Sequence, residues 1–512
     1  MSQTLSCGTT LEARVWRPDG GGPHPVLLMR QPYGAEIAST VTLAHPGWYA
    51  AQGFITVVQD VRGAGASEGV WDTLGVEAAD GAEACAWARS LPGSSGRLGL
   101  YGFSYHGMTQ MLALSGGGAA DAIAPVMAPW DTRAQMATEG GAFRLGFNVG
   151  WAAQMAALQA RRAGDGEAFA ALRAAAMDPP VTGPMPGKPG FCETYRSWCH
   201  LADWVERQDD PAFWGRRSPA RMARTAPEAL RTPALFVGGW FDPFLEGTFA
   251  SFEAFRAAGA PARMVVGAWS HLVWGGRSVD TLLVDHFRAH LAGGGDDAPA
   301  LEWQDMTRGD WRAFDAPPTE RVSFALGGTG LAAAASGGAL VPGAAPDLSE
   351  TFVHDPWRPV PARGLHLAPP FGLVDRADLD ARADVTVFTS EPLGAPLRLA
   401  GPVALEVTLT ADAPGFDVHL VLSRAMPDGR VTALTSGYHR LTDAPETLSL
   451  RPLCATLEPG ERLRLSVAGA AWPAFAVNPG TGACPETTPA HEHRPITISL
   501  RGPAALSLTV AP

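Results

Sequence analysis

The chain has 512 residues, of which 46% are hydrophobic and 18% are charged, and it carries a net charge of −12 at pH 7. This composition is typical of a folded protein with a substantial core, and the length predicts two or three domains. The acidic balance argues against nucleic acid or an anionic membrane surface as the main partner, because both require clustered cations.

Residues 1–130 alternate between two kinds of pattern. Short apolar runs predict buried strands, and the segment 76–90 has the spacing of an amphipathic helix. The predicted strands cover residues 11–18, 26–29, 54–58, 98–101 and 122–128. Because strands that alternate with helices imply a mostly parallel sheet covered on both faces, we expect this region to form the first part of an α/β core.

Residues 131–224 have a different texture. Alanine-rich stretches at 151–163 and 166–176 predict helices, residues 179–189 form a Pro/Gly linker, and no comparable strand pattern is present. We interpret this region as a helical cap inserted on top of the sheet. Strand and helix patterns then resume at residues 233–242, 246–258, 263–271 and 280–291. These are expected to complete the core over residues 225–295.

From residue 296 to residue 512 the pattern is almost entirely that of short strands between Pro- and Gly-rich turns. The predicted strands cover residues 322–325, 385–389, 403–409, 418–423, 432–439, 447–452, 462–467, 497–500 and 506–510. Strands of this length and spacing predict an antiparallel β-sandwich as the third domain.

The most informative motif is Gly102-Phe-Ser-Tyr-His-Gly107, between a predicted strand and a predicted helix. A strand, a serine in a tight turn with glycine on both sides, and a helix form a nucleophile elbow. The second glycine sits one place later than in Gly-x-Ser-x-Gly, and serines between glycines also occur in plain turns. The motif alone therefore leaves both interpretations open.

An acid and a base follow this serine in the expected order. A serine hydroxyl needs a base that removes its proton, and the base needs a carboxylate that orients it. Ser104, Asp242 and His271 each follow a predicted strand, in the chain order Ser, acid, His of α/β-hydrolases. Asp242 precedes a proline and is also a common turn starter, and His271 can be a buried structural residue. The agreement of three placements favours a catalytic triad.

Other histidines compete for the role of base. His106 adjoins Ser104, but at two positions along the chain it is expected to point away from the serine and to have a structural role. His286 and His290 have metal-ligand spacing, yet they lack the Glu of His-Glu-x-x-His, so we expect a solvated helix face. The six cysteines are dispersed without zinc-ligand spacing, and the sequence therefore predicts no metal and no cofactor.

Several segments resemble the cocaine esterase / X-prolyl dipeptidyl aminopeptidase family of serine hydrolases, over essentially the whole chain. The matching segments are Arg30-Gln-Pro-Tyr33, Val58-Gln-Asp-Val-Arg-Gly63, Ala66-Ser-Glu-Gly69, Tyr101-Gly-Phe-Ser-Tyr-His-Gly-Met108, Gly238-Gly-Trp-Phe-Asp242, Gly267-Ala-Trp-Ser-His271, Phe416-Asp-Val-His419 and Pro427-Asp-Gly429. The resemblance implies an α/β-hydrolase core, a helical cap over residues 131–224 and a C-terminal jelly roll over residues 296–512. The chain departs from the family at Cys7, where Asp is common, and at His106, where a small or aliphatic residue is common.

The same resemblance implies roles for individual residues. Ser104 is the expected nucleophile, His271 the base and Asp242 the acid that orients it. The oxyanion hole would combine the backbone N–H of Tyr105 with the side-chain hydroxyl of Tyr33. Removing one such donor typically costs about 3 kcal/mol of transition-state stabilisation.

A substrate pocket is also implied. Phe244, two residues past the acid, resembles an acyl-pocket aromatic of the family. Trp151 and Phe143, which the sequence places on helices, are expected to be its companions, with a core role as the alternative. Asp60 and Arg62 are expected to form a structural ion pair near the elbow.

The expected function is a metal-independent serine hydrolase that cleaves small ester or amide substrates through an acyl-enzyme, with carboxylesterase activity as the leading interpretation. The alternative is an X-prolyl dipeptidyl aminopeptidase or an α-amino-acid ester hydrolase, which must bind a substrate ammonium. Glu139, Glu193 and Glu246 are the acidic candidates for that task. An alternative of another class is a carbohydrate-binding jelly-roll protein with an inactive core.

The sequence also bears on where the protein is located and which partners it has. The N-terminal segment has no signal-peptide pattern, and no apolar run approaches the roughly 18 residues needed to cross a bilayer. We therefore expect a cytoplasmic protein with no nucleic-acid or membrane partner. Its oligomeric state stays open, and a homo-oligomer is one option.

Overall fold

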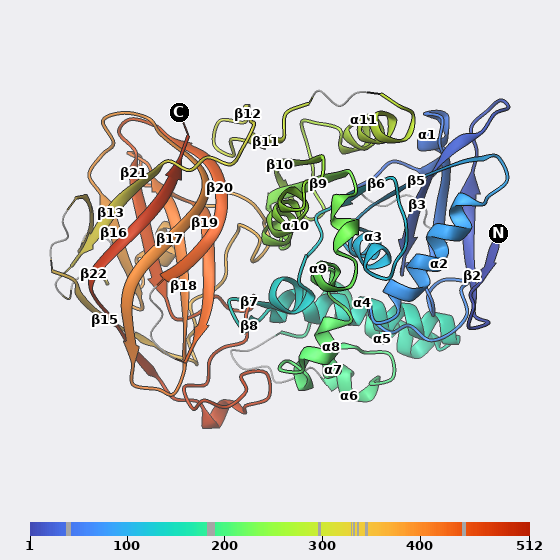
Figure 1. Cartoon of the computed structure of the whole chain (residues 1–512). Helices are drawn as coiled ribbons and strands as arrows, with labels where there is room; N and C mark the ends of the chain where they lie inside the picture. The colour runs from blue at the N-terminus through green and yellow to red at the C-terminus, as the bar shows by residue number, and fades with distance from the viewer. Residues whose placement is uncertain are drawn as a thin grey trace. The chain divides into compact units, whose positions relative to one another are not determined.

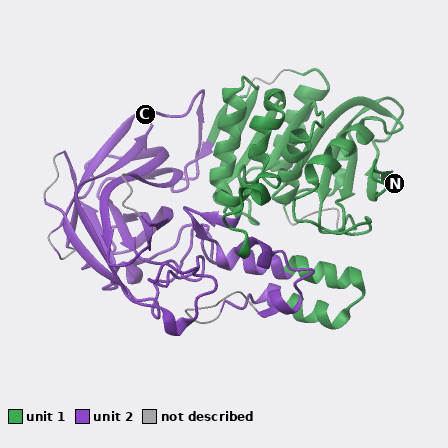
Figure 2. Ribbon diagram, turned by 60° about the horizontal axis from the view of Figure 1, so that its bottom comes forward, with its two compact units in different colours: residues 1–136, 154–173, 206–302 green, residues 137–153, 174–205, 303–512 purple. Residues whose placement is uncertain are grey.

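The computed structural model describes residues 1–36, 42–181, 190–294, 298–328, 330, 333–334, 337–343, 347–442 and 447–511 (Figure 1). The chain divides into two compact units, shown in different colours in Figure 2. Unit 1 comprises residues 1–136, 154–173 and 206–302, and unit 2 comprises residues 137–153, 174–205 and 303–512. Residues 131–224 contribute to both units, and the predicted boundaries after residues 130, 224 and 295 stay predictions.

Unit 1 contains a mostly parallel sheet. Its strands are β1 (Ser2–Thr4), β2 (Thr10–Trp16), β3 (His24–Gln31), β4 (Ile55–Asp60), β5 (Ser94–Phe103), β6 (Ala122–Val126), β9 (Ala234–Phe241) and β10 (Ala262–Ser270). They lie in the order β1-β2-β4-β3-β5-β6-β9-β10. The strands from β4 to β10 are parallel, whereas β1 and β2 are antiparallel to their neighbours. Every residue of β4, β6 and β9 is buried, as expected of strands covered on both faces.

Helices cover both faces of this sheet. The helices of the chain are α1 (Pro46–Ala51), α2 (Glu77–Arg89), α3 (Tyr105–Ser115), α4 (Leu145–Ala163), α5 (Gly166–Met177), α6 (Gly190–Thr194), α7 (Leu201–Glu206), α8 (Pro211–Gly215), α9 (Met222–Thr225), α10 (Leu245–Ala257), α11 (Val279–Leu291) and α12 (Ala377–Asp380). Figure 1 shows α1 and α11 on one side of the sheet and α2 and α3 on the other. The strands and helices predicted over residues 1–130 and 225–295 are therefore present, with ends shifted by a few residues.

The segment between β6 and β9 differs from the prediction in one respect. A π-helix (Arg133–Ala137) leads into a small antiparallel hairpin of β7 (Thr138–Glu139) and β8 (Ala142–Phe143). Phe143 thus lies on a strand, and its predicted placement on a helix was wrong, because two-residue strands are too short to show a periodic pattern. Most of the predicted linker at 179–189 lies outside the described residues.

Unit 2 contains the large β-sheet of the C-terminal region. Its strands are β13 (Arg321–Gly327), β14 (Gly338–Pro342), β15 (Ser349–His354), β16 (Val385–Ser390), β17 (Leu397–Ala411), β18 (Phe416–Ala425), β19 (Val431–Leu441), β20 (Thr447–Leu457), β21 (Arg462–Ala468) and β22 (Ile496–Val510). They lie in the order β19-β18-β21-β16-β14-β13-β22-β17-β20, with β15 beside β22. The pairs are antiparallel apart from β14 with β16. Two further strands, β11 (Leu301–Gln304) and β12 (Trp311–Phe314), precede this sheet in the chain.

Strand β22 joins two predicted strands into one. The sequence predicts separate strands at 497–500 and 506–510, because Gly502-Pro503 interrupts the apolar pattern. The structure continues one strand from Ile496 to Val510 through this dipeptide. Strands β14 and β15 escaped the prediction altogether.

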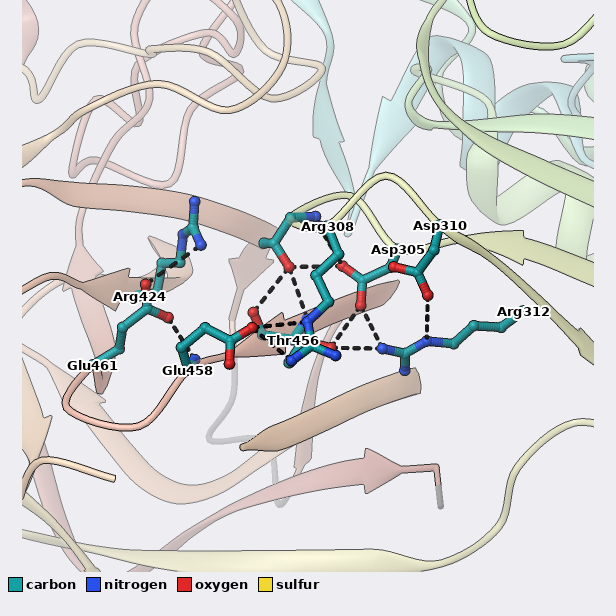
Figure 3. Close-up of polar contacts among 9 residues, drawn as sticks. Asp305, Arg308, Asp310, Arg312, Arg424, Thr456, Glu458 and Glu461 are labelled. Carbon is teal, nitrogen blue, oxygen red and sulfur yellow. Dashed lines mark hydrogen bonds and ion pairs between the residues drawn. The ribbon is translucent and has the colours of Figure 1, made fainter. Parts of the chain in front are cut away.

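The segment that precedes β13 is held to strand β20 by a buried carboxylate (Figure 3). Asp305 is fully buried, and its carboxylate accepts hydrogen bonds from the backbone N–H and the hydroxyl of Thr307 at 2.9 and 2.7 Å. It also accepts from Arg312 Nη2 at 2.5 Å and from Thr456 Oγ1, on β20, at 2.7 Å. Asp305 is thus the central acceptor of this network.

Two further features are the absence of an apolar spanning helix from the described ranges and the state of the cysteines. Among the helices in the described ranges, none combines the length and the apolar character that crossing a membrane requires. All six cysteines are thiols.

Candidate active site

Ser104 occupies a strained turn between β5 and α3. Its backbone has φ 58° and ψ −123°, in a region that residues other than glycine rarely adopt. A Cβ atom on Gly102 would lie 2.4 Å from the Cβ of His106, and one on Gly107 would lie 2.7 Å from the Cβ of Ala128. The close approach of neighbouring segments therefore requires glycine on both sides of the serine.

The structure brings together the three residues predicted as a triad. His271 Nε2 lies 3.0 Å from Ser104 Oγ, and His271 Nδ1 lies 2.6 Å from Asp242 Oδ1. Asp242 is fully buried at the end of β9, and its other carboxylate oxygen accepts a hydrogen bond of 3.0 Å from the Phe244 N–H. A hydroxyl, an imidazole and a buried carboxylate are thus aligned for transfer of the serine proton to the histidine.

Two aromatic rings enclose the imidazole of His271. The Phe103 ring centroid lies 5.2 Å from that of His271 at 48°, and the Phe244 ring lies at the same distance at 87°. Phe244 is only 1% exposed. In this structure Phe244 packs against the histidine, and its predicted contact with an acyl group stays a prediction.

Tyr105 has its backbone at the start of α3 and its ring in the core. As the first residue of the helix, its N–H has no acceptor within the helix. Its hydroxyl donates a hydrogen bond of 3.0 Å to Glu77 Oε1 and accepts one of 3.3 Å from the Leu74 N–H. The pKa of the Tyr105 phenol is raised mainly by burial, and the nearby Glu77 carboxylate raises it further.

Glu77 belongs to a buried network that sequence analysis missed. Arg30 Nη1 lies 2.7 Å from Glu77 Oε2, and both side chains are at most 3% exposed. Arg30 Nε also donates to Gln59 Oε1 at 3.0 Å. The sequence did contain an indication of this network. Arg30 directly follows the apolar run of β3, and a charged side chain buried in a sheet needs a buried partner of opposite charge.

Tyr33 follows β3 and is half-buried. Its ring centroid lies 5.6 Å from that of His106 at 72°, which places the two rings edge to face. Tyr33 also lines a cavity of about 340 Å³ whose lining residues all belong to unit 1. Its role as an oxyanion donor stays a prediction.

His106 is a buried structural residue, as its position in the sequence suggests. It is fully buried against Tyr33 and Phe103, and neither ring nitrogen has a hydrogen-bond partner among the described residues. Burial lowers its pKa to about 3. The imidazole is therefore neutral at physiological pH.

Two expectations about charged and polar groups were wrong. His286 was expected on a solvated helix face, but it is 1% exposed and its Nε2 lies 3.1 Å from the backbone oxygen of Ile123. Arg62 does not pair with Asp60, since its guanidinium binds the Asp80 carboxylate at 2.7 Å. Which side chains become buried between a helix and the sheet depends on how the helix packs against the sheet. A single sequence does not reveal that packing.

Asp60 binds backbone groups instead of a cation. Its carboxylate accepts hydrogen bonds from the Ala35 N–H at 2.6 Å and from the Ala66 N–H at 3.1 Å. Burial raises the pKa of its carboxyl to about 6. Ala35 lies two residues after Tyr33, so Asp60 holds the turn that carries this tyrosine.

Trp151 and Phe143 belong to unit 2. The Trp151 ring packs against His200 at 4.5 Å and Trp204 at 5.8 Å between ring centroids. Phe143, on β8, is fully buried. Phe143 is therefore part of the interior, whereas Trp151 is half-buried against two other rings, and a role of either residue in the pocket stays a prediction.

The three acidic candidates for an ammonium site differ in their surroundings. Glu139 Oε2 accepts hydrogen bonds from Arg144 at 2.5 Å and from His366 at 2.9 Å. Although burial acts in the opposite direction, His366 and Arg144 hold the pKa of Glu139 below its ordinary value. Glu193 is exposed, and Glu246 is half-buried in the first turn of α10. Within the described ranges, no group of three or more His, Cys, Asp and Glu residues is arranged to hold a metal ion.

The chain is similar to known proteins along nearly its whole length. A family model described as X-Pro dipeptidyl-peptidase (S15 family) matches residues 8–273, and a model of the X-Pro dipeptidyl-peptidase C-terminal non-catalytic domain matches residues 293–507. Cocaine esterase from Rhodococcus sp. (strain MB1 Bresler) is 29% identical, over 93% of this chain and 91% of its own.

Two solved structures share the fold. An aminopeptidase from the marine sediment archaeon Thaumarchaeota archaeon superimposes with a TM-score of 0.80 at 21% identity, covering 99% of this chain and 95% of that chain. An α-amino acid ester hydrolase superimposes with a TM-score of 0.77 at 20% identity, covering 100% of this chain and 96% of that chain. The architecture is thus that of an α/β-hydrolase with a C-terminal β domain, as the sequence predicts.

Proposed function

The chain belongs to the X-Pro dipeptidyl-peptidase (S15) family of hydrolases, and we propose that it cleaves ester bonds of small acyl substrates with Ser104 as its nucleophile. The observation that carries this proposal is the 3.0 Å distance between Ser104 Oγ and His271 Nε2, together with the 2.6 Å contact of His271 with buried Asp242. The similarity to cocaine esterase over most of both chains supports ester substrates.

The reaction follows from this geometry. Ser104 Oγ attacks the ester carbonyl carbon while its proton passes to His271 Nε2. The carbonyl oxygen becomes an oxyanion, which receives hydrogen bonds from the Tyr105 N–H and the Tyr33 hydroxyl. The tetrahedral intermediate then collapses, His271 gives the proton to the leaving alcohol oxygen, and an acyl-enzyme remains on Ser104. Water repeats the same steps and releases the acid.

Asp242 determines which nitrogen of His271 accepts the proton. Its carboxylate accepts a hydrogen bond from Nδ1–H, so Nε2 carries the lone pair that faces Ser104. The Phe244 N–H fixes the other oxygen of Asp242. Once His271 is protonated, the buried carboxylate stabilises the imidazolium charge.

Peptidase or amino-acid ester hydrolase activity is the second candidate. The two solved structures named as an aminopeptidase and an α-amino acid ester hydrolase favour it. Such substrates carry an ammonium group that needs an uncompensated carboxylate nearby. Glu139 is already bound by Arg144 and His366, and exposed Glu193 lies 3.8 Å from Arg196. Because both carboxylates have cationic partners, ester substrates without an ammonium group are favoured. Glu246 is the remaining acidic candidate.

Binding of carbohydrate by the C-terminal β domain, with an inactive core, is the third possibility. The aligned Ser104, His271 and Asp242 argue against it, because a protein that only binds has no need to keep a strained serine beside a histidine.

Labelling and turnover together test the proposal. A fluorophosphonate probe is expected to modify Ser104, as read by mass spectrometry of the intact protein and its peptides. Ser104→Ala should lose both the label and the hydrolysis of p-nitrophenyl butyrate, while Ser95→Ala, at an exposed serine in the same unit, should keep both. Unlabelled Ser104 in a folded sample, or full turnover by Ser104→Ala, would overturn the proposal. Comparing p-nitrophenyl butyrate with Ala-Pro-p-nitroanilide separates esterase from peptidase.

A further inference from the structure

The cavity beside Tyr33 has charged side chains in a mixed polar and apolar wall. Its volume of about 340 Å³ is in the range of small-molecule sites. Its lining residues include Tyr33, Glu36, Asp60, Arg161 and Arg162. The aromatic residues predicted to form an apolar acyl pocket are not among them.

Two guanidinium groups of this wall have no acidic partner. Arg161 and Arg162 lie in the last turn of α4, and both are exposed. Among the described residues, no carboxylate oxygen lies within 4.0 Å of either guanidinium, and Arg162 Nη1 donates a hydrogen bond of 2.6 Å to the Gly65 carbonyl. Cations at a helix C-terminus also complement the helix dipole, but that effect leaves most of their N–H donors unused.

The acidic groups of the same wall are already engaged. Glu36 lies 3.7 Å from Arg14, which is outside the cavity. Asp60 accepts hydrogen bonds from the backbone N–H groups of Ala35 and Ala66, and Arg14 and Arg162 act electrostatically on its carboxyl. Because Arg14 and the backbone N–H groups share in this compensation, Arg161 and Arg162 together carry more positive charge than Asp60 takes up.

Tyr33 connects the cavity to the reaction centre. It lines the cavity, and in the proposed mechanism its hydroxyl contacts the carbonyl oxygen of the substrate. In that mechanism, a substrate bound at Ser104 that extends past Tyr33 would reach the cavity. Guanidinium groups match carboxylates in geometry and charge, and they bind them through paired hydrogen bonds.

We propose that this cavity is a subsite for a carboxylate group of the substrate, held by Arg161 and Arg162. The inference rests on the proposed function, and it narrows the substrate class to esters in which one part ends in a carboxylate. It differs from the ammonium site that peptidase substrates require, because the charge of the recognised group is opposite.

Binding of glutarate, a short dicarboxylate, tests the cavity without any reaction. Titration calorimetry with the full chain should detect glutarate at millimolar concentration. The double variant Arg161→Gln/Arg162→Gln should weaken its affinity by at least tenfold. Arg173→Gln, at an exposed arginine of α5 outside the cavity, should leave it unchanged. Undetectable binding to the wild-type protein, or equal affinity in the double variant, would overturn the proposal.

Kinetics test whether the cavity serves the substrate. Glutarate should inhibit hydrolysis of p-nitrophenyl hexanoate competitively, and noncompetitive inhibition would contradict a substrate subsite. A KM about tenfold lower for mono-p-nitrophenyl glutarate than for p-nitrophenyl hexanoate would place the carboxylate on the acyl part. Equal KM values with competitive inhibition would place it on the alcohol part. If Ser104→Ala keeps its activity, the proposed function fails. The glutarate titration still tests carboxylate binding by the cavity, because it does not depend on the reaction.

Discussion

The hydroxyl of Tyr105 lies 3.0 Å from Glu77 Oε1, so the residue after Ser104 begins helix α3 with its backbone and has its side chain in a buried ionic network. Ser104, the preceding residue, has a positive φ that its surroundings must hold in place. The Ser104 N–H donates to the Val126 carbonyl at 2.8 Å on one side, and the Tyr105 ring is fixed by Glu77 on the other. The elbow is therefore anchored from both flanks.

Replacing Tyr105 by Phe should destabilise the protein. The change removes the donor to Glu77 Oε1 and leaves a buried carboxylate oxygen without its partner, which costs about 1–3 kcal/mol. Urea unfolding measures the loss. Tyr101→Phe is a matched control, because the Tyr101 hydroxyl is buried with no hydrogen-bond partner in the described part of the chain. Equal stability of the two variants would show that the contact of Tyr105 with Glu77 contributes nothing.

In the proposed mechanism Tyr33 is an oxyanion donor, so Tyr33→Phe should lower kcat by about 10²- to 10³-fold, because the hydroxyl is removed while the ring remains. KM for p-nitrophenyl butyrate should change little, since the bond to the oxyanion forms in the transition state. Stopped-flow release of p-nitrophenolate measures both constants. Normal turnover by this variant would remove Tyr33 from the oxyanion hole.

Much of this site could be predicted from the sequence because each part has a local pattern. Glycines on both sides of Ser104 and strands that end before Asp242 and His271 are visible without a structure, and the parallel sheet brings such strand ends together. The partners of a buried charge have no such pattern. Glu77 and Arg30 are 47 positions apart, and only the packing of α2 against β3 places them 2.7 Å from each other.

The same limit explains the errors. The placement of Phe143 failed because a two-residue strand has no period. That of His286 failed because the missing Glu of His-Glu-x-x-His argues against a metal site but does not tell which face of α11 is buried. Continuous strands such as β22 are also misread where Gly and Pro interrupt them, since the sequence cannot show that a neighbouring strand maintains the pairing.

Asp305→Asn should lower the free energy of unfolding by about 3 kcal/mol at pH 7, because Arg312 loses a buried carboxylate partner. Burial alone would raise the pKa of Asp305, but hydrogen bonds from Thr307 and Thr456 outweigh it and lower the pKa. A lowered pKa gives stability that is present above about pH 4, the pKa of an unfolded Asp, and is lost as the pH falls through the folded pKa.

Thermal unfolding at several pH values checks this prediction. The difference between wild type and Asp305→Asn should be largest near pH 7 and should shrink below pH 4. Asp310→Asn is the control within the same network (Figure 3), because Asp310 is 56% exposed and lies 3.9 Å from Arg312. A difference that stays constant down to pH 3 would contradict the assignment of the effect to the Asp305 charge.

Cys7 should be the most reactive thiol of the protein. Hydrogen bonds with Thr9, and one from Arg62 Nη2, which lies 3.2 Å from the sulfur, lower the pKa of Cys7 to about 7. Partial burial and the Glu486 carboxylate raise the pKa of Cys484, and burial raises that of Cys85 to about 11. Iodoacetamide at pH 7 followed by peptide mass spectrometry should modify Cys7 first, with an apparent midpoint near pH 7.

The role of Arg62 can be separated from simple exposure. Arg62→Gln should move the alkylation midpoint of Cys7 toward that of an ordinary thiol, near pH 8.5. Arg14→Gln, at a partly exposed arginine of β2 that pairs with Glu36, should leave the midpoint in place. Faster alkylation of Cys484 than of Cys7 at pH 7 would contradict the prediction.

The order in which the two units appear along the chain has a consequence for synthesis on the ribosome. Residues 137–153 and 174–205 belong to unit 2, but the rest of that unit begins at residue 303, and β22 ends at Val510. The nascent chain therefore carries both units unfinished at the same time, whereas domains that are continuous in sequence complete one after the other. A fragment that stops at residue 302 would keep two orphaned pieces of unit 2, so the full-length chain is the appropriate material for every experiment proposed above.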